Sequence, residues 1–552
     1  MPSADAAIAS LPQAAGPTGP GAVPLDPVPA ADSSVDLRKL LIIFAVMLGT
    51  LLEIIDSSIV NVALPDMMGS LGATLDEIGW VITGYIISNV VVIPMTAWLA
   101  ARFGRRRYFT TSILVFTAAS FFCGFAHTLT ELVTFRVIQG LGGGALLSTS
   151  QTIMTETFPR TKQGMAQAIF GVGVMIGPSL GPTLGGWITD NYSWPWIFYV
   201  NVPLGLLAAF VSATFLEEPT HLRRVDSVDW PGIALLVIGV GCLQTVLERG
   251  ERNDWFESQM IVGLTAAAAL ALLLFLVREL TAEHPVVDFR VLRHRPLWVG
   301  CLLGCAMGVG IYGSTFLLPV YTQELLGWSA WNAGLAILPS SIATAIAMTI
   351  AGRLVMRVGP GPLLGFGMLI FIAGMVGMGH WTLQSGFGDL FWPQVNRGLG
   401  LGFMFVSIST ATLGGIPVRD VAQGAGLYNL CRQLAGSFGI AVLATVLDRR
   451  GTVHHAYLSE HVSLLDPATM QRVEAMARGF ALRGLDLVHA RRAAAQALDG
   501  ILQAQAGMLA FEDCYHLVLV LFLILLPLVL LLRTPKAQEP AAREAVARES
   551  IA

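Results

Sequence analysis

The feature that most constrains this chain is a series of fourteen apolar stretches, each long enough to cross a lipid bilayer. A spanning helix needs about 20 predominantly apolar residues. Hydrophobic residues make up 54% of the chain and charged residues only 13%, a balance that excludes a soluble fold. The stretches predict an all-α membrane protein with helices at 38–64, 77–100, 108–126, 130–154, 164–189, 197–216, 231–248, 259–277, 297–322, 330–352, 358–380, 389–414, 421–447 and 511–533.

The distribution of Lys and Arg orients these spans. With the termini inside the cell, 21 basic residues lie in the tails and cytoplasmic loops, and only Arg249 and Arg252 lie in short outer loops. Cytoplasmic loops carry an excess of Lys and Arg, and long loops are exempt from this rule. The sequence therefore predicts that both termini are cytoplasmic and that the long loop at 448–510 lies outside.

Two segments far apart in the chain share a pattern that indicates an internal repeat. Residues 97–105 (AWLAARFGR) follow the second span, and residues 352–360 (GRLVMRVGP) follow the tenth, with Leu, Arg and Gly in step. Transporters built from repeats enclose their site near the midplane, between the repeats. We predict two six-helix bundles, at 37–216 and 297–533, joined by a linker with two inserted helices at 217–296. The cytoplasmic tails at 1–36 and 534–552 are predicted to be disordered.

Two carboxylates, Glu53 and Asp56, lie inside the first span and on one face of its helix. An ionised carboxylate at the centre of a bilayer costs about 2.5 to 3.5 kcal/mol on insertion scales, so it is a functional candidate by default. The alternative for each is a hydrogen bond to a neighbouring helix. Asp56 and Arg136 each lie nine residues from the outer end of their span, about 13 Å deep, and could therefore pair. We predict that Asp56, Arg136 and Glu53 couple transport to protons.

The fifth span carries glycines at every fourth position, together with two prolines. Small residues let a neighbouring helix backbone approach closely, and proline kinks a helix. Generic packing of small residues is the alternative to a pliable, leak-tight seam. The residues concerned are Gly173, Gly177, Pro178, Gly181, Pro182, Gly185 and Gly186.

These motifs carry a family resemblance. The repeated loop, Leu132-x-x-x-Arg136-x-x-Gln139-Gly140 and the fifth-span glycines resemble signatures of the major facilitator superfamily. With fourteen spans, the segments 56–65, 194–203 and 429–437 resemble the EmrB/QacA-type drug:proton antiporters, most closely the EmrB branch. The resemblance covers about residues 36–535. It implies the major facilitator fold, two six-helix bundles plus two inserted helices.

The cytoplasmic loop departs from the family pattern. Ala97 and Ala101 stand where the family usually has Gly and Asp, and Met356 occupies the Asp position in the second copy. We therefore expect the basic residues of the inward gate to meet helix ends or acidic loop residues. The predicted gate comprises Arg102, Gly104, Arg105, Arg357 and Gly359.

Two further buried arginines, Arg397 and Arg432, belong to the second half. Intramembrane charges face the bundle interior. Arg432 therefore either contacts a substrate or pairs structurally with backbone carbonyls or Glu53. The other candidates for the cavity wall are polar or aromatic, and for the aromatic ones core packing or lipid contact is the alternative. They are Asn61, Gln139, Gln151, Asn429, Tyr85, Phe316, Tyr321 and Phe405.

The resemblance implies a proton-driven multidrug exporter of hydrophobic and amphipathic compounds in the bacterial inner membrane. It also implies a tripartite system with a periplasmic adaptor, a membrane fusion protein, near residues 448–510 and an outer-membrane channel. A dedicated exporter of one metabolite and a membrane-bound enzyme are the alternatives. The sequence has no P-loop, dinucleotide motif or metal-ligand spacing, so we expect no cofactor, metal, nucleic-acid partner or enzymatic activity.

Overall fold

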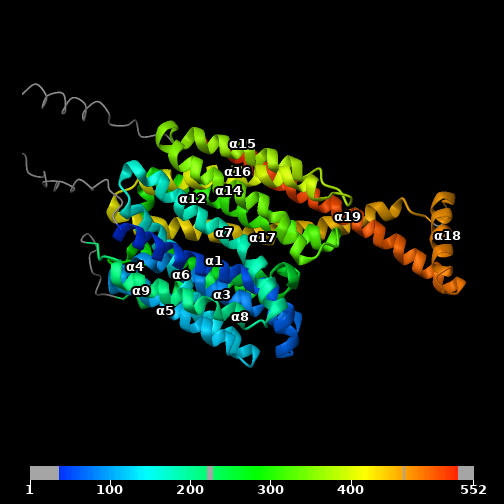
Figure 1. The fold of residues 1–552 in the computed structure, drawn as a ribbon, viewed down its shortest axis with the longest axis horizontal. Helices are drawn as coiled ribbons and strands as arrows, with labels where there is room; N and C mark the ends of the chain where they lie inside the picture. Colours follow the sequence, from blue (N-terminus) through cyan, green and yellow to red (C-terminus); the bar gives the residue numbers. More distant parts are fainter. Residues whose placement is uncertain (1–36, 220–227, 464–465, 532–552) are drawn as a thin grey trace, which may run out of the picture. The chain divides into compact units, whose positions relative to one another are not determined.

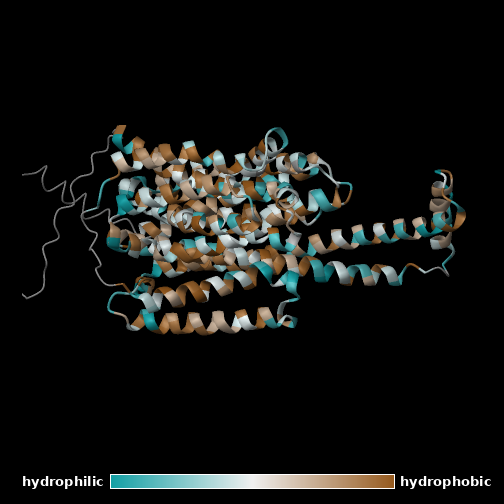
Figure 2. Ribbon diagram, turned by 90° about the horizontal axis from the view of Figure 1, so that it is seen from below, coloured by the Kyte–Doolittle hydropathy of each residue, from teal (hydrophilic) through white to brown (hydrophobic). Residues whose placement is uncertain are grey.

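The computed structural model describes residues 37–219, 228–463 and 466–531. Within these ranges the chain is helical and contains no strand. The tails predicted at 1–36 and 534–552 lie outside the described residues. Helices occupy all fourteen predicted windows, in chain order. Hydrophobic residues predominate along these helices, and hydrophilic residues gather at many of their ends (Figure 2).

The first half of the chain forms six long helical runs. The second run is interrupted where Pro94 removes a backbone donor, and a 3₁₀ turn, η1 (Ile93–Met95), joins its two parts. The helices are α1 (Leu37–Leu71), α2 (Leu75–Ile78), α3 (Trp80–Val92), α4 (Thr96–Phe103), α5 (Arg105–Gly124), α6 (Leu129–Thr157), α7 (Gln163–Asn191), α8 (Trp196–Tyr199) and α9 (Asn201–Phe215).

Two inserted helices, α10 (Trp230–Arg249) and α11 (Gln259–Thr281), pack against each other, and α10 also contacts α3 and α17. The second half follows them. A π-helical segment, η6 (Val309–Gly313), interrupts its first run. The helices are α12 (Arg295–Gly308), α13 (Ser314–Val320), α14 (Ala330–Val358), α15 (Pro360–Met378), α16 (Phe387–Gly414), α17 (Val421–Glu460), α18 (Pro467–Ala481) and α19 (Leu487–Leu525).

By length and apolarity alone, ten helical runs of the described chain qualify as membrane spans, or eleven with the bent α7. The three predicted spans that fall short are α5, α6 and α16. Each is 20 residues or longer, and each carries buried polar residues, such as Ser112, Gln139 and Arg397. Their low apolarity therefore reflects interior positions among other helices.

Two glycines make equivalent turns in the two halves. Gly104 joins α4 to α5 with φ +87°, and Gly359 joins α14 to α15 with φ +93°. Residues with a side chain rarely adopt this conformation, so glycine is required at both positions. The matching turns agree with the internal repeat that the sequence indicates.

The halves meet along two sets of helices. Helix α7 packs along α14, and α17 packs against α6, η1 and α4. Helices α17 and α19 continue past the ends of their neighbours, and α18 lies at the far end of this hairpin (Figure 1). A small apolar cluster of Val473, Ala477 and Ala494 joins α18 to α19.

Candidate functional site

The centre of the first half holds an ion pair between α1 and α6. Asp56 and Arg136 are 0% and 1% exposed, and Arg136 Nη1 lies 2.5 Å from Asp56 Oδ2. The equal depth of the two residues predicted that they could pair, and they do. A buried charge that loses its partner destabilises a protein by about 3 to 5 kcal/mol. The two charges therefore depend on each other.

Amide side chains complete the coordination of the Asp56 carboxylate. Gln139 Nε2 and Asn201 Nδ2 both donate to Asp56 Oδ1, at 2.8 and 2.9 Å. Gln139 Oε1 also accepts from Arg136 Nη1 at 2.8 Å, and Asn201 donates to Ser120 Oγ at 3.1 Å. Helices α1, α5, α6 and α9 are thus tied to one carboxylate, and any change in its charge reaches all four.

Arg136 is also held from α3. Its Nε donates to the Val81 carbonyl at 3.1 Å, and its guanidinium lies 4.1 Å from the centre of the Tyr85 ring. A cation over an aromatic face is attracted by the ring quadrupole. Tyr85 and Gln139, predicted to line the cavity, therefore lie beside the ion pair.

The glycine stripe of α7 contacts α1, the helix that carries Asp56. Side chains built at Gly177 and Gly181 would overlap Ile54 and Ser58, and at Gly185 a Cβ would lie 2.8 Å from Ile59 Cγ1. The parts of α7 up to Pro178 and from Thr183 are inclined by 41°, as the prolines predicted. The seam therefore places a bent helix directly against the helix of the ion pair.

Two further buried charges, Glu53 and Arg432, come from different halves. Glu53 is 7% exposed, and its Oε1 accepts from Asn89 Nδ2 at 3.0 Å, while its Oε2 has no partner. Arg432 of α17 is 1% exposed, and none of its three guanidinium nitrogens has a hydrogen-bond partner among the described residues. Its guanidinium lies 5.7 Å from the centre of the Phe405 ring. Arg432 makes no direct ion pair with Glu53.

Arg397, the counterpart of Arg136 in the repeat, has hydroxyl partners. It donates to Ser340 Oγ at 3.2 Å, to Ser314 Oγ at 2.8 Å and to Thr315 Oγ1 at 3.2 Å. Each hydroxyl can accept without carrying charge. Among the described residues, Arg397 therefore has no carboxylate partner, whereas Arg136 is paired with Asp56.

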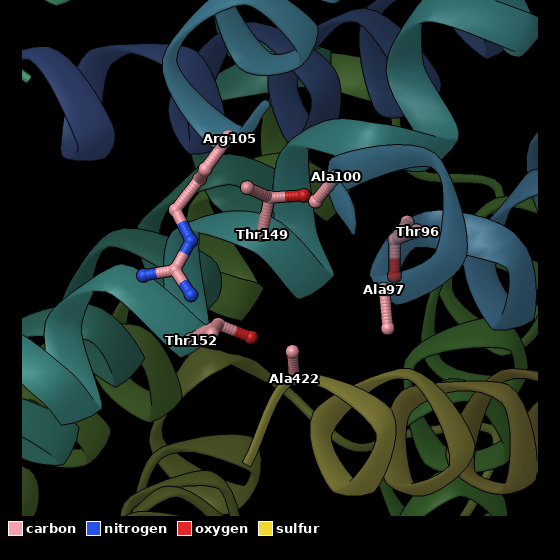
Figure 3. Close-up of a pocket in the computed structure, with 7 residues that line it drawn as sticks. All are labelled: Thr96, Ala97, Ala100, Arg105, Thr149, Thr152 and Ala422. Atoms are coloured by element: carbon pink, nitrogen blue, oxygen red, sulfur yellow. The ribbon is translucent and has the colours of Figure 1, made fainter. Parts of the chain in front are cut away.

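Polar contacts join the halves near the end of α6 and the start of α17. Asn429 Nδ2 donates to Gln151 Oε1 at 2.7 Å, and Gln151 Nε2 donates to Gln167 Oε1 at 3.2 Å. A small pocket lies close to this contact, and its lining comes from both halves (Figure 3). It is lined by Thr96, Ala97, Ala100, Arg105, Thr149, Thr152 and Ala422.

Arg105 of the predicted gate meets acidic residues, as we expected. Its guanidinium makes two hydrogen bonds to Glu156, at 2.5 and 3.0 Å. The Glu218 carboxylate accepts from the backbone N–H groups of Arg105 and Arg106 at 2.8 and 3.1 Å, which places an anion at the start of α5. These contacts lie within the first half. Arg102 is half-buried and Arg357 is exposed.

The remaining candidates lie elsewhere. Asn61 is exposed on α1, and Phe316 is half-buried against the main core. Tyr321 stacks on Trp381 at 5.2 Å between ring centres, and its hydroxyl donates to the Thr382 carbonyl at 2.7 Å. It therefore belongs to a packed aromatic cluster with Trp381 and Tyr515.

Asn89, Ser120 and Asn201 take part in the site but were not among the predicted residues. Asn89 is the one amide side chain in the apolar span predicted at 77–100, so the sequence alone could have marked it as a candidate. Nothing local marks Asn201 as a partner of Asp56, because that contact depends on how α1 and α9 pack. In the hairpin of α17, α18 and α19, His454 and His455 bond to different carboxylates, Asp513 and Asp499. Among the described residues, no three metal-ligating side chains gather.

Many apolar helices packed around buried charges define a polytopic membrane protein of the transporter type. The family model "Major Facilitator Superfamily" matches residues 46–440. The chain belongs to the major facilitator superfamily, which confirms the predicted family and fold class.

Individual proteins that are similar in sequence or in fold refine this comparison. The chain is 38% identical over 428 residues to the "Multidrug export protein EmrB" of Escherichia coli strain K12, covering 77% of this chain and 83% of that protein. It is 31% identical over 489 residues to the "Fatty acid resistance protein FarB" of Neisseria gonorrhoeae, covering 88% and 95%. The human organic anion transporter MFSD10 shares the fold, with a TM-score of 0.56 and 14% identity over 88% of this chain and 100% of that one.

Proposed function

We propose that this chain is a proton-coupled antiporter that exports hydrophobic and amphipathic drugs. The family and a relative named for multidrug export support efflux of drugs. The buried pair of Asp56 and Arg136 is the observation that carries proton coupling, because a carboxylate can take up a proton and thereby release its cation.

The coupling step begins at the ion pair. A proton that reaches Asp56 from the outer side neutralises the carboxylate and ends its attraction to Arg136. Helix α1 then loses the charged contact that ties it to α6, and it moves against α7 along the glycine seam. Since α7 packs along α14 of the other half, the movement changes how the two halves meet. Drug binding and loss of the proton to the cytoplasm restore the pair.

The membrane potential supplies part of the driving force. Moving one elementary charge across 100 mV releases about 2.3 kcal/mol. A tenfold concentration difference corresponds to about 1.4 kcal/mol. One inward-moving proton therefore suffices to export one uncharged molecule against a gradient of that size.

The proposed exporter lies in the inner membrane with both termini in the cytoplasm, as the Lys and Arg distribution favours. A hairpin of α17, α18 and α19 then stands on the outer side, with large apolar side chains at its turn. Leu482, Leu487 and Val488 are 90%, 72% and 59% exposed. Apolar residues exposed together mark a contact for another protein. We assign this surface to a periplasmic adaptor that connects the pump to an outer-membrane channel.

A dedicated exporter of one metabolite is the second candidate. One relative is named for resistance to fatty acids, so a narrower range of amphiphiles is a real alternative. Efflux of a panel of dyes, detergents and fatty acids from cells that carry the chain separates the two. A multidrug exporter lowers the accumulation of several unrelated compounds, whereas a dedicated exporter acts on one.

The decisive experiment measures dye transport into inverted membrane vesicles under an imposed pH step. The wild-type chain should concentrate dye when the vesicle interior is acidic, and Asp56→Asn should abolish this while dye binding persists. Asp66→Asn is the matched control, because Asp66 lies on the same helix and is exposed. Proton-driven transport that survives in Asp56→Asn would refute the assignment.

A further inference from the structure

Arg432 is a buried cation without a hydrogen-bond or ion-pair partner among the described residues. Its side chain is 1% exposed, and Nε, Nη1 and Nη2 make no hydrogen bond in the described structure. A guanidinium stays charged at every physiological pH and carries five N–H donors. Leaving such a group unpaired away from water costs several kcal/mol. The fold therefore leaves the N–H donors of the Arg432 guanidinium available for hydrogen bonds to another molecule.

The other two buried intramembrane arginines show that this is a specific property of Arg432. Arg136 has a carboxylate, an amide and a backbone carbonyl as partners, and Arg397 has three hydroxyls. All three arginines are at most 4% exposed. The packing of this fold therefore satisfies two of them and leaves the third available to a ligand.

Aromatic side chains from both halves lie near Arg432. The Phe405 ring centre lies 5.7 Å from its guanidinium and 6.3 Å from the Phe170 ring centre. Phe405 belongs to the second half and Phe170 to the first. The neighbouring hydroxyl of Tyr312 is occupied, since it donates to Gln433 Oε1 at 2.9 Å. An apolar body next to a free cation suits an amphiphile with an anionic head.

Glu53 opposes Arg432 from the first half. The two charges interact electrostatically, yet they make no ion pair, and Glu53 Oε2 stays without a partner. An anion bound at Arg432 would be repelled by an ionised Glu53. An ionised Glu53 therefore weakens the binding of an anion at Arg432, and protonation of Glu53 strengthens it.

We propose that Arg432 binds the carboxylate of amphiphilic organic acids and thereby makes such acids a substrate class of the exporter. This inference rests on the function proposed above. A planar guanidinium can hold a carboxylate through two parallel hydrogen bonds, which a neutral head group cannot replace. The aromatic rings of Phe405 and Phe170 hold the apolar part of the acid.

Equilibrium binding to the full-length protein in lipid nanodiscs tests this site. The probes are 11-(dansylamino)undecanoic acid and its primary amide, followed by dansyl fluorescence and corrected with empty nanodiscs. The wild type should bind the acid at least tenfold more tightly than the amide. Arg432→Gln should weaken binding of the acid at least tenfold and leave binding of the amide within twofold. Arg432→Lys should keep part of the preference, and Glu53→Gln should bind the acid at least as tightly as the wild type.

Arg449→Gln is the matched control, because Arg449 lies on the same helix and is exposed. Equal affinity of the wild type for acid and amide would overturn the inference. So would equal weakening of both probes in a folded Arg432→Gln protein, since that result makes Arg432 a packing residue. A preference for the acid without proton-driven dye transport would instead refute the exporter and leave the anion site standing.

Discussion

Gly181 of α7 lies so close to Ser58 of α1 that any side chain at position 181 would overlap the Ser58 hydroxyl. The Ile59 backbone nitrogen lies only 3.0 Å from the Cβ position. Two residues before Ser58, Asp56 makes the buried ion pair. A tight contact between α7 and α1 therefore lies within one helical turn of the residue whose charge the proposed mechanism changes.

Gly181→Ala should force α7 away from α1. Overpacking of this kind costs about 1 to 3 kcal/mol, so we expect a lower melting temperature and a severalfold loss of proton-driven dye transport. Gly186→Ala is the control, since its Cβ would meet only Val62 at an ordinary 3.8 Å. Equal effects of the two substitutions would show that the stripe tolerates a methyl group and that the seam is not tight.

The ion pair predicts a non-additive effect on stability. Asp56→Asn leaves Arg136 charged and unpaired, so it should destabilise the protein by about 3 to 5 kcal/mol. Combining it with Arg136→Met removes both charges and should recover most of the loss, without restoring transport. Unfolding of the purified single and double variants measures the coupling. Losses that simply add would contradict a direct interaction in the folded protein.

The contact between Asn429 and Gln151 predicts how the two halves separate beside the small pocket. Asn429→Leu removes the donor of this hydrogen bond between the halves, so the closed arrangement should become less populated. In a background without the native cysteines, a cysteine at Ala422 should then react faster with an alkylating reagent. Gln433→Leu, which breaks a bond to Tyr312 within the second half, is the control. Unchanged labelling in Asn429→Leu would mean that this bond does not hold the halves together.

The exposed turn between α18 and α19 predicts that a substitution can reduce drug resistance of cells without reducing transport itself. Replacing both Leu482 and Leu487 by serine should leave dye transport in inverted vesicles unchanged, because both side chains are exposed and far along the chain from the buried charges. Drug resistance of cells should fall, because the proposed adaptor loses its contact surface on the pump. Arg483→Gln, in the same turn, should retain resistance. Full resistance in the double leucine variant would rule out this surface as the docking site.

The sequence predicted those features that depend on one helix or on depth in the membrane. The positions of the helices follow from apolar length, the bend of α7 follows from its prolines, and the pairing of Asp56 with Arg136 follows from equal depth. Each requires only the rise of a helix and the width of a bilayer.

The features that the sequence did not predict depend on which helices are neighbours. Asn201 and Gln139 hold the same carboxylate oxygen because α9 and α6 both face α1, which no local pattern reveals. The stripe of α7 was predicted as a seam, but its partner helix was not. The ligands of Arg397 are also scattered, since Ser314 and Ser340 lie on separate helices and resemble many other hydroxyls.

The unequal surroundings of Arg136 and Arg397 make the two repeats chemically different despite their common architecture. Arg136 faces a group that can gain or lose a proton, whereas the hydroxyls around Arg397 keep one protonation state throughout the physiological range. A variant in which hydroxyls replace the carboxylate at Arg136 would keep a polar arginine site in each half but leave neither arginine with an acid as partner. Under the proposed mechanism, the asymmetry confines energy conversion to the half that holds Asp56, and the half that holds Arg397 serves as the fixed surface against which it works.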